Sequence, residues 1–263
     1  MSQPFVEIPS TPHHLASAPF ECTTCAASTV AHHCSSPVIH FARNGICLKY
    51  ETRVPHGRSS RLELLTNRLS ASASPGRMNV IILPGSGCTP TRRSNFYAWL
   101  ERELIARGIT ADVRMADMPS PYVCERAVWV PFTENVFKCD ENSIIVGHSS
   151  GAVCAMRVAE RNKLRAIVLV AGYDDDLGDA GERASGYFGP DAFDYDAIRA
   201  NCDGRVTCVI GERDDLVPAD VQRALAAKLD AAVKSCPGRD HFFHAPCEEI
   251  VDVVRAFAVT PGG

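Results

Sequence analysis

The sequence predicts an α/β protein: a parallel sheet of about six strands with helices on both faces, preceded by an N-terminal extension that we expect to be largely disordered. From residue 79 onward, short apolar stretches alternate with segments of helical periodicity, which is typical of a parallel sheet covered on both sides. The five residues Gly147-His148-Ser149-Ser150-Gly151 stand between one such apolar stretch and one such helical segment. A chain of 263 residues, 46% of them hydrophobic, suffices for one domain of good size and an additional segment.

Residues 1–77 differ in composition from the rest of the chain. They are rich in Ser, Thr, Pro, Ala and His and have little periodic apolar structure, apart from a short strand-like stretch at 46–50. We therefore predict a low-order extension and linker over 1–77 and a folded domain over 78–263. Because Met78 begins the patterned region, one hypothesis is that the natural polypeptide starts there.

The extension contains residue types that bind zinc, but their spacing fits no zinc-finger template. These residues are Cys22, Cys25, His32, His33 and Cys34. We predict incidental thiols here and no metal site.

The folded part is predicted to contain six strands and six helices, in alternation. The predicted strands are residues 79–83, 111–115, 143–146, 166–170, 206–210 and 231–235. The predicted helices are residues 96–106, 124–137, 151–161, 194–200, 219–228 and 247–257. In the first helix, Phe96, Trp99, Leu100 and Leu104 fall on one face at helical spacing.

The five residues 147–151 form a Gly-x-Ser-x-Gly motif in a strand-to-helix context. This context is the one that the nucleophile elbow of an α/β-hydrolase requires, since the sharp turn needs small flanking residues and raises the central hydroxyl above the sheet. The motif therefore predicts an α/β-hydrolase fold with Ser149 as a nucleophile.

A serine nucleophile needs a base, and the sequence offers few candidates. Six of the nine histidines lie in the extension, and His148 adjoins the nucleophile, with its side chain expected to point away along the elbow. His241 and His244 follow the last predicted strand. We prefer His241, which follows a tight Gly-Arg-Asp turn, and expect His244 to be a surface residue.

The acid that orients the base is expected after the penultimate strand, because the chain order in this fold is Ser, acid, His. Counting four residues back from Pro218 selects Asp214, whereas counting forward from Gly211 selects Asp215. We prefer Asp214 and leave Asp215 open. The other aspartate is then a helix cap or a solvated charge.

Acyl transfer also needs N–H donors for the oxyanion. We predict one from Ser150, which follows the nucleophile, and one from the loop Gly85-Ser86-Gly87 after the first strand. This loop lacks the third glycine of a dinucleotide fingerprint and the Gly-Lys-Ser/Thr of a P-loop, so we predict no nucleotide and no other cofactor.

Residues 79–257 resemble the small serine hydrolase family around retinoblastoma-binding protein nine and its bacterial relatives. The strings that carry the resemblance are residues 125–132, 145–152, 176–179 and 182–188. The resemblance implies a compact α/β-hydrolase that lacks the first two strands of larger members. It also implies a Ser-Asp-His triad that cleaves small ester or amide substrates through an acyl-enzyme.

Transferred residue by residue, the resemblance assigns the nucleophile to Ser149 and the base to His241. The family's acid lies in an Asp-Asp pair before a proline, where this chain is one residue shorter, so Asp214 and Asp215 both stay open. Residues 183–188 are expected to form a lid or pocket wall.

The resemblance also suggests a candidate partner, the retinoblastoma protein. A Leu-x-Cys-x-Glu stretch in the mammalian namesake was used to argue for that binding. The matching residues here are 137–141, in which Phe137 replaces the leucine and is expected to be packed. We therefore do not expect a retinoblastoma-type partner.

Composition and charge bear on binding partners and cellular location. The net charge of −4 does not indicate nucleic-acid binding, the longest apolar runs are too short to cross a bilayer, and the N-terminus lacks a signal-peptide pattern. We expect a cytoplasmic monomer whose twelve cysteines are mostly buried thiols. Its predicted function is serine hydrolysis of a small-molecule ester or amide, and the alternative is a non-catalytic interaction scaffold with the same fold.

Overall fold

The computed structural model describes residues 41–42, 45–46 and 77–259. The chain divides into two units, residues 1–58 and 59–263. In the first unit, strands β1 (Phe41–Ala42) and β2 (Gly45–Ile46) pair antiparallel. The predicted strand at 46–50 shares only Ile46 with this pair. The rest of that stretch, the extension's predicted disorder and the cysteines and histidines considered for zinc lie outside the described residues.

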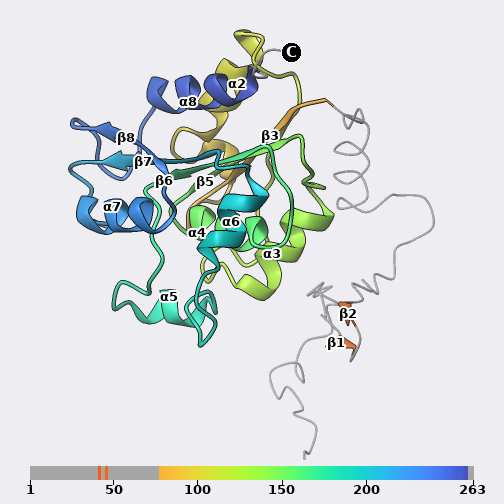
Figure 1. Ribbon diagram of the computed structural model, residues 1–263, viewed down its shortest axis with the longest axis vertical. Helices are drawn as coiled ribbons and strands as arrows, with labels where there is room; N and C mark the ends of the chain where they lie inside the picture. Colours follow the sequence, from red (N-terminus) through yellow and green to blue (C-terminus); the bar gives the residue numbers. More distant parts are fainter. Residues whose placement is uncertain (1–40, 43–44, 47–76, 260–263) are drawn as a thin grey trace, which may run out of the picture. The chain divides into compact units, whose positions relative to one another are not determined.

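The second unit contains a six-stranded sheet in which all neighbouring strands are parallel. The order across the sheet is β4-β3-β5-β6-β7-β8 (Figure 1). The strands are β3 (Asn79–Leu83), β4 (Val113–Arg114), β5 (Ser143–His148), β6 (Ala166–Val170), β7 (Val206–Gly211) and β8 (Ala232–Cys236). The predicted parallel α/β fold is confirmed.

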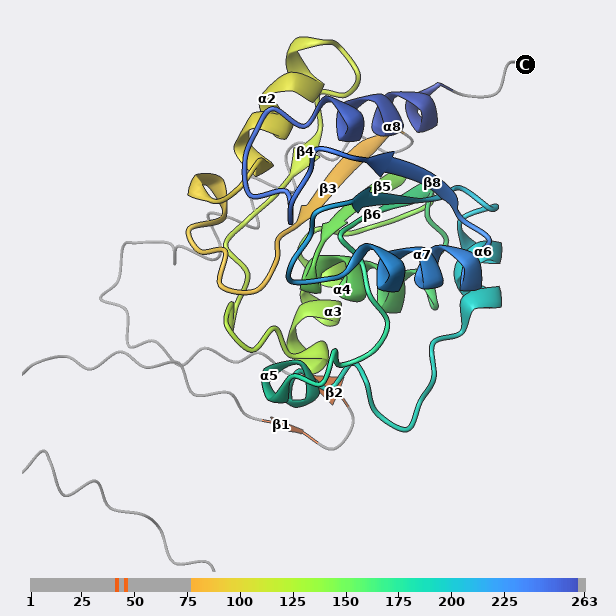
Figure 2. The same ribbon diagram turned by 90° about the vertical axis from the view of Figure 1, so that its left-hand side faces the viewer.

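Helices cover both faces of this sheet (Figures 1 and 2). Helices α2 (Tyr97–Ala106) and α8 (Glu248–Ala258) lie on one face. The other face is covered by α3 (Arg126–Asn135), α4 (Ser150–Ala159), α6 (Tyr195–Asn201) and α7 (Ala219–Lys228).

The strands alternate their side chains between the two covered faces. In β3, Val80 and Ile82 belong to the core under α2 and α8, whereas Ile81 and Leu83 belong to the core on the opposite face. Residues 80–83 of β3 are therefore buried on both faces of the sheet, which explains why this run is continuously apolar.

Two short elements were not predicted from the sequence: the 3-10 helix η1 (Thr91–Arg93) and helix α5 (Ala180–Ala184). In addition, α3 begins two residues after the predicted start at Cys124. Cys124 has a positive φ of 57° and Glu125 has an extended ψ of 130°, so neither residue continues a helix.

The sheet topology gathers the predicted site at one edge. The chain runs outward from β3 to β4 and then returns to β5 on the other side of β3, so the strand order reverses between β3 and β5. In open α/β sheets, ligands bind at the carboxyl ends of the strands next to such a reversal. The loop that follows β3 and the elbow that follows β5 both lie there, because Leu83 is paired with Gly147.

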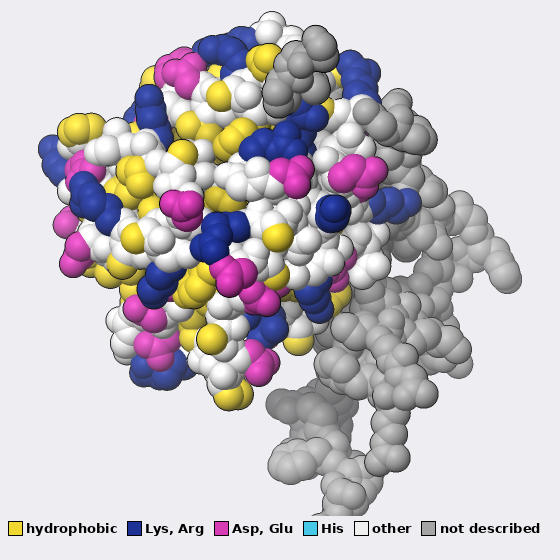
Figure 3. Space-filling view, viewed as in Figure 1, with side chains coloured by type: hydrophobic (Ala, Val, Ile, Leu, Met, Phe, Trp, Pro, Cys, Tyr) yellow, Lys and Arg dark blue, Asp and Glu magenta, His cyan; other side chains and the backbone are white. Residues whose placement is uncertain are grey.

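The surface shows no single dominant charge on the face seen in Figure 3, where basic and acidic side chains are interspersed with apolar ones. Within residues 77–259, no helix has both the length and the apolar character needed to span a bilayer.

Candidate active site

Ser149 occupies a strained turn between β5 and α4. Its φ of 54° and ψ of −123° are unusual for a residue with a side chain, and its own N–H donates to the Val170 carbonyl at 2.9 Å. A Cβ at Gly147 would lie 2.4 Å from the Gly151 carbonyl oxygen, and one at Gly151 would lie 2.4 Å from that of Leu83. The two glycines are therefore required by close backbone approaches on either side of Ser149.

His241 and Asp214 are brought together from two different loops. Asp214 follows β7 and His241 follows β8, and His241 Nδ1 lies 2.8 Å from Asp214 Oδ2. Both side chains are buried. Because a carboxylate can only accept, Nδ1 carries the hydrogen and Nε2 is left with a free lone pair.

Asp214 is held in place by further donors. Its Oδ1 accepts from the N–H groups of Leu216 and Val217, both at 2.9 Å, and its Oδ2 also accepts from Gln222 Nε2 at 3.1 Å. Burial alone would raise the pKa of this carboxyl, but the bonds from His241 and the two backbone N–H groups hold its pKa below the ordinary value.

The two alternatives left open by the sequence lie elsewhere. Asp215 is exposed, and so is His244. The structure thus places Asp214, and not Asp215, against the imidazole of His241.

The loop after β3 has one backbone donor directed to no acceptor among residues 77–259. The Gly85 N–H donates to Tyr97 Oη at 2.9 Å and the Gly87 N–H donates to the Pro121 carbonyl at 2.7 Å. The Ser86 N–H has no such partner in the described chain, and neither does the Ser150 N–H at the start of α4. Of the three loop residues predicted for oxyanion binding, Ser86 is therefore the one whose N–H is available.

The loop after β3 also lies directly against the elbow. A Cβ at Gly85 would lie 3.2 Å from Ser149 Cβ and 3.4 Å from His148 Nδ1. Ser149 itself is half-buried, and no hydrogen bond joins its hydroxyl to His241 within the described residues. Catalytic hydrogen bonds are often long in substrate-free structures and tighten when substrate binds.

Polar groups line the side of the elbow next to Ser150. Ser150 Oγ lies 3.2 Å from Tyr173 Oη, and the Tyr173 hydroxyl in turn lies beside Glu182 of α5. Burial raises the pKa of the Glu182 carboxyl, although the Tyr173 hydroxyl opposes this. The buried Cys124 thiol, whose pKa burial raises to about 12, lies beside the hydroxyls of Ser86 and Ser150.

Two residues around the site, Tyr97 and Gln222, were not singled out from the sequence, and a third, His148, makes a contact that was not predicted. Tyr97 and Gln222 are both buried; Tyr97 Oη lies 2.7 Å from His148 Nδ1, and Gln222 Nε2 donates to Asp214 Oδ2. No pattern marks them, because each comes from a helix whose spacing also fits ordinary core packing. His148 was expected only to point along the elbow, whereas its Nε2 lies 2.9 Å from the His241 carbonyl oxygen.

The stretch considered for retinoblastoma binding begins with a buried residue, as expected. Phe137 is 1% exposed and its ring packs edge-on against Phe132, with 5.4 Å between ring centroids.

The cysteines of the described residues are thiols, and most are buried as predicted. Six are buried and two, Cys88 and Cys139, are half-buried. The four remaining cysteines of the chain lie outside the described residues. Within residues 77–259, no three His, Cys, Asp or Glu side chains form a cluster that could hold a metal ion.

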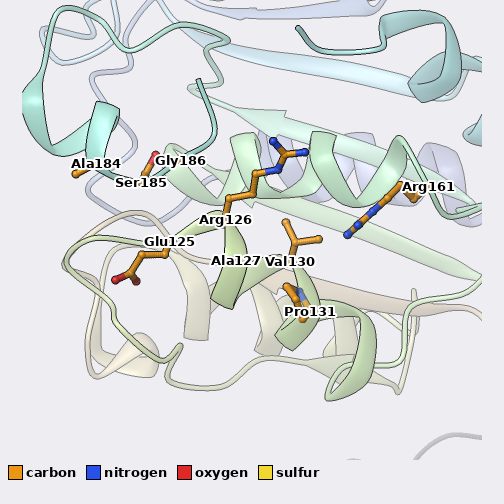
Figure 4. A pocket seen from close by; sticks show the side chains of 9 residues that line it. All are labelled: Glu125, Arg126, Ala127, Val130, Pro131, Arg161, Ala184, Ser185 and Gly186. Atoms are coloured by element: carbon orange, nitrogen blue, oxygen red, sulfur yellow. The ribbon is translucent and has the colours of Figure 1, made fainter. Parts of the chain in front are cut away.

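A cavity of about 410 Å³ lies between α3, α4 and the segment around α5 (Figure 4). Arg126 and Arg161 lie along it, and Glu125, Ser185 and Gly186 help to line it. Residues 184–186 of the stretch expected to form a lid or pocket wall line this cavity, whereas none of the predicted triad and oxyanion residues does, so we do not assign it to the reaction.

Comparison with known proteins identifies related hydrolases. The profile of the family described as serine hydrolase matches residues 80–246. The chain is 37% identical over 191 residues to the rat protein named serine hydrolase RBBP9, an alignment that covers 72% of this chain and 98% of the rat protein. It is 29% identical over 170 residues to the putative hydrolase YdeN of Bacillus subtilis, which covers 62% and 85% of the two chains.

Solved structures show the same fold at low sequence identity. The crystal structure of the B. subtilis ydeN gene product superposes with a TM-score of 0.59 at 23% identity, covering 68% of this chain and 98% of that one. A putative YdeN-like hydrolase from Pectobacterium atrosepticum gives a TM-score of 0.51 at 14% identity, covering 76% and 97%.

Proposed function

This chain belongs to the serine hydrolase family, and from this premise we propose that it cleaves small ester or amide substrates with Ser149, His241 and Asp214 as its catalytic triad. The observation that carries the proposal is the 2.8 Å bond between Asp214 and His241, formed beside a serine held at a positive φ. A nucleophile, a base and a group that orients the base are the parts that acyl transfer needs.

In the first half of the reaction, Ser149 Oγ attacks the carbonyl carbon of the substrate while His241 Nε2 takes the hydroxyl proton. The resulting oxyanion accepts hydrogen bonds from the N–H groups of Ser86 and Ser150. When the tetrahedral intermediate collapses, the bond to the leaving group breaks and His241 returns the proton to the departing alkoxide or amine. Ser149 is left as an acyl ester.

In the second half, water attacks the acyl-enzyme and His241 removes its proton. Collapse of the second tetrahedral intermediate releases the carboxylic acid and restores the Ser149 hydroxyl. Throughout, the ionised Asp214 stabilises the imidazolium that forms on His241, since its low pKa keeps it charged.

Exposed apolar side chains lie on the loops that carry the triad, and they support an apolar acyl or leaving group. Leu216 is 59% exposed two residues after Asp214, and Phe243 is 40% exposed with its ring 5.4 Å from that of His241. Tyr122 is 74% exposed, and its carbonyl accepts from Ser86 Oγ at 3.0 Å.

The proposal is tested with a fluorophosphonate probe, which phosphonylates an activated serine. The wild-type protein is expected to be labelled, and Ser149→Ala is expected to lose all labelling while keeping its circular dichroism spectrum. Ser143→Ala is the matched control, because it removes a serine hydroxyl at the start of β5, the end of the strand away from the elbow. Labelling that persists in Ser149→Ala would refute the nucleophile. Absence of labelling in folded wild-type protein would instead support the scaffold alternative.

A further inference from the structure

A buried chain of hydrogen bonds connects the loop after β3 to the loop that carries His241. The Gly85 N–H donates to Tyr97 Oη at 2.9 Å, Tyr97 Oη lies 2.7 Å from His148 Nδ1, and His148 Nε2 lies 2.9 Å from the His241 carbonyl oxygen. Tyr97 is fully buried and His148 is 1% exposed. One member of this hydrogen-bond chain, His148, is the residue that precedes Ser149.

The donor and acceptor of each of these hydrogen bonds follow from the groups at the two ends of the series, a backbone carbonyl and a backbone N–H. A backbone carbonyl can only accept, so the His148 Nε2 must carry the hydrogen that bonds to His241. Burial lowers the pKa of His148 to about 3, so the ring is neutral near pH 7 and its Nδ1 must accept. The Tyr97 hydroxyl therefore donates to His148, and its oxygen is free to accept the Gly85 N–H.

The Tyr97 hydroxyl has two other neighbours, and neither reverses this direction. Asn95 Nδ2 donates to the same oxygen at 3.2 Å, which is compatible with an oxygen that accepts. Cys88 Sγ, at 3.4 Å, is within bonding distance for a sulfur acceptor, but the hydroxyl has a single hydrogen and the 2.7 Å contact with the accepting Nδ1 of His148 requires it. Burial also raises the pKa of Tyr97 well above its ordinary value, so the hydroxyl keeps its proton.

We propose that His148 is a positioning residue which, together with Tyr97, holds the oxyanion loop and the base loop in register with Ser149. This inference rests on the proposed function. Gly85 immediately precedes Ser86, whose N–H is proposed to bind the oxyanion, and the bonded carbonyl belongs to the residue that acts as base. One imidazole thus fixes the backbone on two sides of the nucleophile, where a displacement of about 1 Å can cost about 100-fold in rate.

The structure also explains why an imidazole suits this position. The site requires one acceptor and one donor on the same small, neutral group. A carboxamide has the same pair, so His148→Gln should retain both bonds, whereas His148→Leu removes both. Tyr97→Phe keeps the ring packing but removes the hydroxyl that bonds to both the Gly85 N–H and His148 Nδ1.

The test measures the second-order rate constant for fluorophosphonate labelling of Ser149, together with kcat and KM for p-nitrophenyl acetate. We expect labelling to slow by about 100-fold in His148→Leu and by about 10-fold in Tyr97→Phe, with kcat reduced and KM changed by less than about 2-fold. His148→Gln should stay within about 3-fold of wild type. The double variant Tyr97→Phe/His148→Leu should be no slower than His148→Leu alone, since both substitutions break one connected chain.

Thr110→Val is the matched control, because it removes a buried hydroxyl bond to the Met78 carbonyl at the opposite end of the sheet. It should label at the wild-type rate. Folded His148→Leu and Tyr97→Phe that label at the wild-type rate would overturn the inference, as would His148→Gln that is as slow as His148→Leu. If His148→Leu does not fold, Tyr97→Phe decides. If wild type itself is not labelled, the proposed function fails and this inference fails with it.

Discussion

The acid of the proposed triad illustrates what individual residues contribute. Asp214 and Asp215 are adjacent and chemically identical, but only Asp214 turns inward, where four donors from the chain surround its two oxygens. Because one of these donors is His241 Nδ1, the carboxylate determines which nitrogen of the imidazole carries the hydrogen. The identity of the acid therefore depends on loop conformation and not on residue type.

We predict that Asp214→Asn lowers kcat for ester hydrolysis by about 10⁴-fold. An asparagine can present its amide N–H to His241, which favours the tautomer with the hydrogen on Nε2 and leaves Ser149 without a base. The measurement is steady-state hydrolysis of p-nitrophenyl acetate by protein shown to be folded.

Asp215→Asn is the matched control, since the exposed Asp215 carboxylate lies outside the His241 hydrogen-bond network. Its kcat should stay within about 2-fold of wild type, in line with the small effects of most surface substitutions. If Asp215→Asn were the inactive variant, the assignment of the acid would have to be exchanged.

At the scale of the elements, four loops at the carboxyl ends of parallel strands supply the site. The loop after β3 contains Gly85 to Gly87, the elbow follows β5, Asp214 follows β7 and His241 follows β8. The elbow requires a close backbone approach between elements, because α4 begins against the backbone at the end of β3. A Cβ atom added at Gly151 would lie 2.4 Å from the Leu83 carbonyl oxygen and 2.6 Å from the Pro84 carbonyl oxygen.

We predict that Gly151→Ala destabilises the protein by about 3 kcal/mol, because the added methyl group meets backbone atoms that cannot rotate away. Urea unfolding followed by circular dichroism measures the effect. Gly189→Ala is the control, since no heavy atom lies within 4 Å of its added Cβ, and it should change the free energy of unfolding by less than about 0.5 kcal/mol. Equal stabilities of the two variants would contradict the steric role of Gly151.

The elements that the sequence predicts are those with a long apolar pattern. Strands β3 and β6 and helix α7 coincide with the predicted residues, because buried apolar runs and helical spacing report on packing that is set locally. Helix α5 has only five residues, none of them buried, and is started by the Asp179 side chain capping two N–H groups. No periodicity can appear over so short and exposed a segment.

The candidate site was predictable to a similar extent. Ser149 follows from its motif, and His241 follows from the scarcity of histidines outside the first 77 residues. Tyr97, Gln222 and the two bonds of His148 could not be predicted, because they depend on how helices and loops far apart in the sequence meet.

At the scale of the whole molecule, the folded unit encloses a histidine that must stay neutral. His148 lies under the elbow between the two faces of the site, with Tyr97 and His241 as its bonded neighbours and Asp214 acting on it through charge. Burial and the nearby His241 lower its pKa from an ordinary 6.5 to about 3. Folding therefore excludes a proton that the unfolded chain would bind.

Because the folded state excludes this proton, the free energy of unfolding depends on pH. Proton linkage determines whether stability rises or falls with pH. Between about pH 6.5 and pH 3 the unfolded state carries a proton on His148 that the folded state lacks, so the contribution of His148 is fully present above pH 6.5 and is lost as the pH falls. The loss amounts to about 1.4 kcal/mol per pH unit within that window. The raised pKa of Glu182 acts in the opposite direction, but it is common to wild type and variants of His148.

We therefore predict that the stability of His148→Gln falls less steeply on acidification than that of wild type. Urea unfolding at pH 7.5, 6 and 5 gives the free energy of unfolding of both proteins, and their difference removes the titration of all other groups. The difference should shift in favour of the variant by about 1.2 kcal/mol between pH 6 and pH 5 and stay nearly constant above pH 7. Parallel curves would show that His148 can be protonated in the folded state, which would also remove the reason for its assigned tautomer.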